Sequence, residues 1–169
     1  MRGFNDPLKQ KEIVKRIYKL KVDVVFLLET RVKYSKMGSI VERWFKGWSY
    51  LHNYDHAVNG RIWVLWKSSV DIRVLDMNDQ CITMTLVKLG MGLVVSVVYG
   101  SNLGSERRRL WEFLRQVYGG MDACPWIVAG DFNVVASIEE SSEHLLAEIN
   151  SVRSDSECCV LRTPPKLFI

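Results

Sequence analysis

The chain has 169 residues, of which 48% are hydrophobic and 25% charged, a balance typical of one globular domain rather than of a disordered segment. No apolar run approaches the roughly 18 residues of a membrane span, and the polar start lacks a signal-peptide core, so the sequence predicts a nuclear or cytoplasmic protein without membrane contact. The four cysteines lack metal-ligand spacing, which argues against a zinc site and favours reduced thiols.

The net charge of +4 is distributed unevenly along the chain. Residues 1–50 carry twelve Lys and Arg against five Asp and Glu. A basic front could attract a polyanion such as nucleic acid, whereas solvated helix faces explain the same charge without any ligand. Charge alone favours the solvated faces.

The first half of the chain alternates helix and strand signals. A helix is predicted to begin at Asp6-Pro7, because Asp caps helix N-termini and Pro suits the first helical position. Residues 22–28 form an apolar run typical of a strand buried on both faces, and residues 35–45 have the period of a second helix. Strands are then predicted over 48–54 and 61–67, joined around Asn59-Gly60.

The second half continues with strands before a last helix–strand pair. Strands over 70–77 and 81–89 are predicted to turn at Asn78-Asp79-Gln80, and 93–99 is another buried strand. Ser105 is predicted to cap a helix, and 126–129 form a short strand. The inward face of that helix is predicted to carry Leu110, Trp111, Leu114, Val117 and Tyr118.

This order of elements predicts an α/β fold in which a mixed sheet packs against helices. The domain is expected to span residues 1–142. Residues 143–169 are acidic at first and then lack any period, so they are predicted to be a poorly specified tail.

Polar residues follow three of the buried strands directly. Glu29 ends the first strand, Tyr99 and Asn102 lie at and beyond the end of another, and Asp131 and Asn133 follow the last. Ligands of open α/β sheets gather outside the carboxyl ends of strands, so these side chains are expected to converge. Hard oxygen ligands suit Mg²⁺, which can polarise a phosphoryl oxygen. Each residue alone is also explained as a solvated strand end, a turn cap or a packed ring.

Four segments carry a resemblance to a known family. They are Arg2-Gly3-Phe4-Asn5-Asp6-Pro7-Leu8-Lys9-Gln10, Phe26-Leu27-Leu28-Glu29-Thr30-Arg31, Val98-Tyr99-Gly100-Ser101-Asn102 and Gly130-Asp131-Phe132-Asn133. With these segments the chain resembles the endonuclease/exonuclease/phosphatase superfamily, and most closely the endonuclease region of LINE-type (non-LTR) retrotransposons of plants.

The resemblance implies a DNase I-like fold of two packed sheets flanked by helices, and Mg²⁺-dependent cleavage of phosphodiester bonds in DNA. It implies that Glu29 is a metal ligand and that Asp131 orients or deprotonates the attacking water. Asn133 and Tyr99 would contact the scissile phosphate, and Asn102 is a weaker candidate for substrate contact.

The sequence also departs from the family pattern. The family has a first strand ending in an Asn before the position of Arg2, and a second half that ends in a Ser-Asp-His motif; this sequence contains neither. His52 and His56 are interpreted as surface residues. We therefore expect the chain to form the N-terminal half of the fold and to lack catalytic activity. We also expect it to self-associate through exposed apolar surfaces near Val94, Val97 and Trp126.

Two alternatives remain open from the sequence. The first is a non-catalytic nucleic-acid-binding or protein-binding remnant that uses the basic front and Arg107-Arg108-Arg109. The second is a small-molecule phosphatase of the same superfamily.

Overall fold

Ten elements make up the part of the chain that the computed structural model describes, which is residues 4–57, 61–121 and 124–134. In order, they are α1 (Pro7–Leu20), β1 (Val24–Leu28), α2 (Tyr34–Trp44), β2 (Ser49–His52), β3 (Ile62–Trp66), β4 (Asp71–Met77), β5 (Cys81–Lys88), β6 (Met91–Tyr99), α3 (Gly104–Gly119) and β7 (Trp126–Asp131). None of the helices described is both long and apolar enough to cross a bilayer. The predicted Asn59-Gly60 turn and the 143–169 tail fall outside the described residues.

The strands form two sheets rather than one. The first sheet has the order β1-β3-β2 and is wholly antiparallel, and the second has the order β4-β5-β6-β7, with only β6 and β7 parallel. The single mixed sheet predicted from the order of elements is therefore wrong. The two packed sheets that the family resemblance implied are confirmed.

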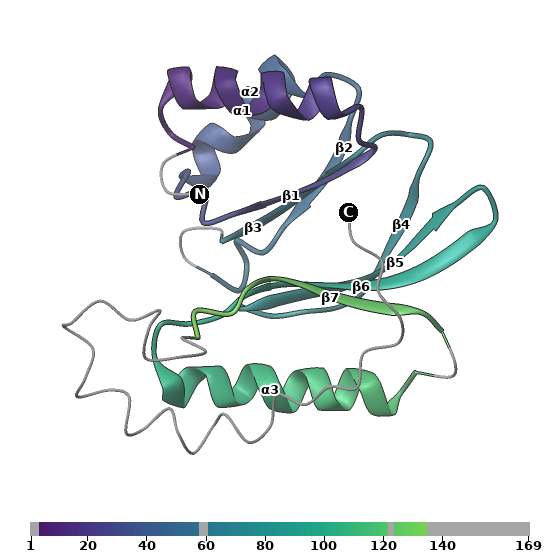
Figure 1. Cartoon of the computed structure of the whole chain (residues 1–169). Coiled ribbons are helices and arrows are strands. Elements are labelled where there is room, and N and C mark those ends of the chain that lie inside the picture. The colour runs from purple at the N-terminus through teal and green to yellow at the C-terminus, as the bar shows by residue number, and fades with distance from the viewer. Residues whose placement is uncertain (1–3, 58–60, 122–123, 135–169) are drawn as a thin grey trace.

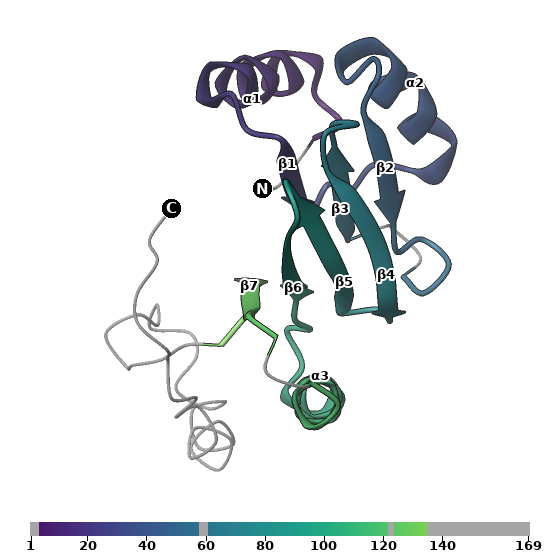
Figure 2. The ribbon, with the colours of Figure 1, turned by 90° about the vertical axis from the view of Figure 1, so that its right-hand side faces the viewer.

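The two sheets lie face to face between two layers of helices (Figure 1). Helices α1 and α2 cover the outer face of the first sheet, and α3 runs along the outer face of the second (Figures 1 and 2). The carboxyl ends of β1, β6 and β7 lie at the same end of the layer between the two sheets.

The strand β1 is short and apolar because both of its faces are covered. Val25 and Leu27 pack in the cluster under α1 and α2, whereas Val24, Phe26 and Leu28 pack between the sheets. Burying one such side chain stabilises the fold by about 1.5–3 kcal/mol. The continuous apolar run predicted for this strand has its physical reason in this position.

Helix α1 begins as predicted, and α3 does not. The Asp6 carboxylate accepts a hydrogen bond from the Leu8 amide at 2.9 Å. Helix α3 begins at Gly104, one residue before the predicted cap, and the Ser101 hydroxyl accepts from the Leu103 amide at 3.2 Å. Tyr118, predicted to face inward, is 67% exposed.

Exposed apolar surface is expected from the sequence near Val94, Val97 and Trp126, and this expectation is wrong for two of these three residues. Val94 and Val97 are buried, because β6 lies between β5 and β7 in the second sheet and is covered on both faces. Trp126 is half-buried, and its indole Nε1 donates to Ser96 Oγ at 3.0 Å. Within the described residues β7 pairs only with β6, and Ile127 on this strand is 44% exposed.

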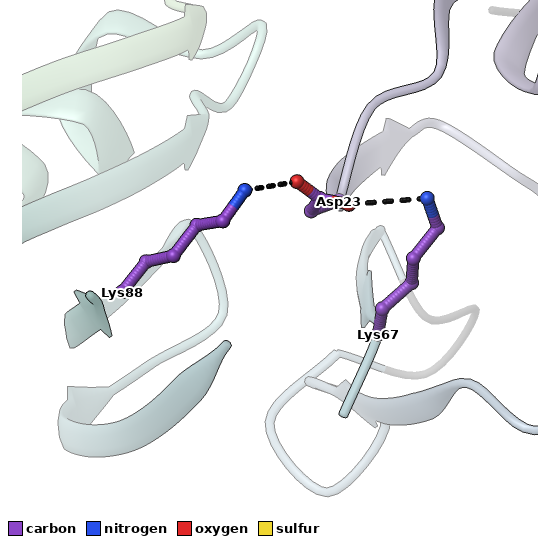
Figure 3. A network of polar contacts seen from close by, with 3 residues as sticks. All are labelled: Asp23, Lys67 and Lys88. Carbon is purple, nitrogen blue, oxygen red and sulfur yellow. Dashed lines mark hydrogen bonds and ion pairs between the residues drawn. The ribbon is translucent and has the colours of Figure 1, made fainter. Parts of the chain in front are cut away.

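An ion-pair network joins the two sheets at the end opposite the carboxyl ends of β1, β6 and β7. Asp23, just before β1, contacts Lys67 Nζ at 3.1 Å and also pairs with Lys88 at the end of β5 (Figure 3). Hydrogen bonds to Lys88 and then to Lys67 lower the pKa of the Asp23 carboxyl below its usual 3.8. All three side chains are partly exposed, so solvent screens the network.

The network predicts a pH-dependent difference between the wild type and Asp23→Asn. Because the folded pKa is lowered, the stability that the carboxylate contributes is present above 3.8 and is lost as pH falls through the folded pKa. We expect Asp23→Asn to lower the thermal midpoint at neutral pH, with the difference from wild type vanishing in acid. Melting curves recorded over a pH series measure this, and a constant difference at every pH would contradict it.

Candidate active site

The predicted site residues meet at one end of the layer between the sheets. The parallel pairing of β6 with β7 places Tyr99 directly opposite Asp131. The ring of Tyr99 packs against the core between the sheets, and the charge of Glu29 acts on its phenol. Glu29, Tyr99, Asp131 and Asn133 are thus brought together from three strand ends, β1, β6 and β7.

The loop after β7 is locked to the loop after β6. The Gly100 amide donates to the Asp131 carbonyl at 2.7 Å, and the Asn133 side-chain amide donates to the Gly100 carbonyl at 2.6 Å. The Asn133 backbone amide also donates to Asp131 Oδ1 at 2.9 Å, which closes an Asx turn. The turn requires a left-handed φ of 51° at Asn133, a conformation that Asn tolerates better than most residues.

Two glycines permit this close approach. A Cβ on Gly100 would lie 2.5 Å from the Phe132 carbonyl oxygen, and a Cβ on Gly130 would lie 1.9 Å from that of Val98. Gly130 also has a φ of 147°, which side chains rarely allow. The ring of Phe132 stacks on Trp111 of α3 at 5.5 Å, so the motif is anchored on its outer side.

Glu29 sits in a constrained position at the end of β1. Its φ is 51°, its amide donates to the Arg61 carbonyl at 2.8 Å, and its side chain is only 14% exposed. Arg31 Nη2 contacts Glu29 Oε1 at 2.6 Å. The carboxylate therefore has a cationic partner in this structure, and that partner competes with any metal ion for the same oxygen.

Electrostatics keep the Tyr99 phenol protonated. Burial is the largest cause that raises its pKa, and the negative charge of Glu29 adds to it. A hydrogen bond with Asn133 acts in the opposite direction, and Asp131 raises the pKa a little further. The guanidinium carbon of Arg61 lies 5.9 Å from the centroid of the Tyr99 ring. At neutral pH the phenol is consequently a hydrogen-bond donor.

Asn102 does not join this group in the same way. It is exposed in the loop after β6, and its described contact is through its backbone carbonyl, which accepts from Arg107 Nη1 at 2.9 Å. The same nitrogen donates to the Ser101 carbonyl at 2.8 Å. Arg107 is 6% exposed, so its assignment to a basic binding surface is wrong; it holds the loop that carries Asn102.

Two further residues support the site and carry no signal in the sequence. Gln80 is buried; its Oε1 accepts from the Ser101 amide at 2.7 Å, and its backbone carbonyl accepts from the Tyr99 amide at 2.8 Å. Asn53 is fully buried, and its Oδ1 accepts from the Arg61 amide at 3.1 Å. Asn53 thereby positions the residue whose carbonyl holds Glu29. Both belong to segments that read as ordinary turns or strand ends.

The donor set fits a magnesium ion only in part. Mg²⁺ is commonly bound by one or two carboxylates together with waters and substrate phosphates. Glu29 provides one carboxylate for such an ion, and the nearby carboxylate of Asp131 already accepts a hydrogen bond from its own turn. In the described ranges no group of three or more His, Cys, Asp and Glu side chains is placed to hold a metal.

Comparison with known proteins assigns the sequence to a family. The family model for the endonuclease/exonuclease/phosphatase family matches residues 1–147. No curated protein matches the sequence.

Solved structures match the fold at low identity. The endonuclease domain of TRAS1, a telomere-specific non-LTR retrotransposon, is 13% identical with a TM-score of 0.62, over 79% of this chain and 59% of that one. A D. rerio TDP2 humanized by 14 mutations is 13% identical with a TM-score of 0.60, over 79% of this chain and 59% of that one. D. rerio TDP2 complexed with a single-strand DNA product is 15% identical, with a TM-score of 0.54 over 75% and 54%.

At such identities the likeness establishes the fold, and the chain spans just over half the length of the structures it matches. The family match covers most of the sequence, including every predicted site residue. This chain belongs to the endonuclease/exonuclease/phosphatase family and has its DNase I-like fold.

Proposed function

We propose that this chain supplies one wall of a magnesium-dependent phosphodiesterase site that acts on DNA, of the kind found in retroelement endonucleases, and that the 169-residue chain by itself is catalytically inactive. The observation that carries the proposal is the convergence of Glu29, Tyr99, Asp131 and Asn133. The retroelement class rests on the Leu-Glu-Thr and Gly-Asp-Phe-Asn segments, and the fold match to the TRAS1 endonuclease domain is consistent with it.

Each residue has a distinct part in the proposed reaction. Glu29 would hold Mg²⁺, which when bound polarises a phosphoryl oxygen and stabilises the leaving oxygen. The Asp131 carboxylate, fixed by its turn, orients the attacking water and accepts its proton. The protonated Tyr99 phenol and the Asn133 amide, which hydrogen-bond to each other in this structure, donate hydrogen bonds to the phosphate as negative charge builds.

The proposed inactivity rests on the groups that the described residues bring to the site. The family resemblance assigns an opposing histidine to the phosphate. Here His52 pairs with Trp63 on the outer face of the first sheet, and His56 is exposed in the loop after β2. A missing positioned acid or base alone costs about 10²–10⁴-fold in rate.

A complementation experiment tests the proposal. With Mg²⁺ present, the chain alone is expected to nick plasmid DNA no faster than its Glu29→Ala/Asp131→Ala double variant. Fusing the chain to the parts of the TRAS1 endonuclease domain that lie outside the match is expected to restore nicking. Nicking by the chain alone that needs both carboxylates would overturn the proposed inactivity, and a folded but inactive chimera would overturn the proposed site.

One observation favours a second candidate, a non-catalytic nucleic-acid-binding module. The Arg31–Glu29 contact neutralises the proposed metal ligand. In that case DNA would bind with a steep salt dependence, since phosphate contacts weaken as counterions compete. Binding with no nicking by the chimera would support this second candidate.

A further inference from the structure

Four aromatic rings lie together on the outer face of the first sheet, along β2 and at the start of α2. We call them the aromatic platform: Tyr34 at the start of α2, Tyr50 and His52 on β2, and Tyr54 just beyond. The ring centroids of Tyr34, His52 and Tyr54 lie 5.1–5.4 Å from one another, and that of Tyr50 lies 6.5 Å from that of His52. Such spacings are those of attractive aromatic pairs.

The inner part of the platform is rigid. The Tyr54 hydroxyl donates to the Val32 carbonyl at 2.6 Å and accepts from Trp63 Nε1 at 3.2 Å. Nδ1 of His52 is buried and has no hydrogen-bond partner among the described residues, so ring packing holds the imidazole. The outer rings differ from this base, because Tyr34 is 65% exposed and Tyr50 is 45% exposed.

A glycine follows Tyr34 one turn later in α2. Gly38 lies four residues later on the same face of α2, and helical side chains lean toward the preceding turn. A Cβ added at Gly38 would meet no atom within 4 Å, so packing does not require glycine there. Glycine inside a helix is destabilising relative to alanine. Its presence leaves open space on α2 one turn after the exposed Tyr34.

The surroundings of the platform are basic. Arg31, Lys33 and Lys36 are exposed on the segment that leads from Glu29 into the first turn of α2. The carboxylate of Glu29 in this stretch is already paired with Arg31, and the exposed Asp55 is the acidic residue next to Tyr54. A surface of exposed rings with cations beside them suits a strand that offers both bases and phosphates.

The platform belongs to the same sheet as β1, the strand that leads into Glu29. Trp63 of β3 pairs with Leu27 of β1 on one side and with His52 of β2 on the other. On β2 the platform is therefore two strands away from β1, and it lies on the outer face of the first sheet. Helix α2 covers this face (Figure 2).

We propose that the aromatic platform binds single-stranded nucleic acid that continues from the candidate active site, with bases stacked on Tyr34 and Tyr50 and phosphates beside Lys33 and Lys36. Single strands are selected because a duplex keeps the faces of its bases inside its own stack. The inference rests on the proposed function for its choice of polymer. The binding itself requires neither metal nor catalysis.

Fluorescence anisotropy of a short labelled oligothymidylate, measured with the whole chain in EDTA, tests the proposal. Tyr34→Ala and Tyr50→Ala are each expected to weaken binding by about 5- to 150-fold, the range reported for loss of one stacked base. Tyr34→Phe keeps the ring and is expected to bind like the wild type. Tyr118→Ala removes a tyrosine of similar exposure on α3 and is expected to leave binding unchanged.

Gly38→Leu separates a blocked platform from a damaged fold. The new side chain would lie over the Tyr34 ring, so oligothymidylate binding is expected to fall while the thermal midpoint rises with the better helix former. Unchanged binding by Tyr34→Ala, or no binding by the wild type, would overturn the platform, as would equal binding of a duplex that depends on the same tyrosines.

The two proposals fail separately. A chimera that nicks DNA while Tyr34→Ala leaves oligothymidylate binding intact would contradict the platform alone. Platform-dependent binding beside a folded, inactive chimera would contradict the proposed catalytic site alone.

Discussion

In the complemented chimera, Glu29→Gln is expected to lower magnesium-dependent nicking by about 10³-fold, because the charge stabilisation that a bound metal supplies amounts to several kcal/mol. Glutamine keeps the shape of the side chain, and the backbone amide of residue 29 still donates to the Arg61 carbonyl. The same change removes the negative charge that pairs with Arg31. The initial rate of plasmid nicking, followed over a magnesium titration, measures the effect.

Asp131→Asn and an exposed carboxylate provide the comparison. Asp131→Asn is expected to lower the rate by about 10²–10⁴-fold at saturating magnesium, since it removes a proton acceptor rather than a metal ligand. Glu42→Gln changes an exposed acid on α2 and is expected to leave the rate unchanged. If the Glu29→Gln chimera cuts as fast as its parent, Glu29 does not hold the metal.

The second large effect is expected at Gly130, which precedes Asp131 in β7. The Cβ of an alanine would lie 1.9 Å from the Val98 carbonyl oxygen and 2.8 Å from the Val98 amide nitrogen, and backbone atoms cannot rotate away. The φ of 147° adds strain for any side chain. Gly130→Ala is therefore expected to destabilise the fold by about 4 kcal/mol or more, or to detach β7 from β6.

Chemical denaturation and amide hydrogen exchange distinguish these two results. Because β7 pairs only with β6 in the described residues, its amides are expected to lose protection even where the remaining strands stay folded. Gly92→Ala is the matched control, since its Cβ would meet no atom within 4 Å in β6. It is expected to change stability by within about 0.5 kcal/mol. A Gly130→Ala variant with wild-type stability and protection would contradict the close approach.

The sequence predicted those residues of the candidate site that lie at strand ends. Glu29, Tyr99 and Asp131 each follow an apolar run, and such runs are recognisable because burial on both faces removes polar residues. The family resemblance supplied their roles, which stay predictions. The Arg31–Glu29 contact was not anticipated, because two residues that are close in sequence pair only when the backbone turns suitably, here with a left-handed φ at both.

The division of the strands into two sheets could not be predicted from local pattern. β3 and β4 are separated by only four residues, yet they belong to different sheets, because the turn after Trp66 carries the chain from one layer to the other. Hairpin signals record that neighbours in sequence can pair, and they do not record which of several antiparallel strands do so.

By itself the sequence determined the helices and strands, the cap at Asp6 and the glycine before Asp131, since helix period, capping and backbone freedom act between residues that are near in the chain. Only the tertiary structure decided which polar residues are buried. Arg107 and Gln80 hold the loop after Tyr99, and Asn53 holds the residue behind Glu29. Gln80 reaches its partners across 21 and 26 residues, and such long-range hydrogen bonds leave no periodic trace in the sequence.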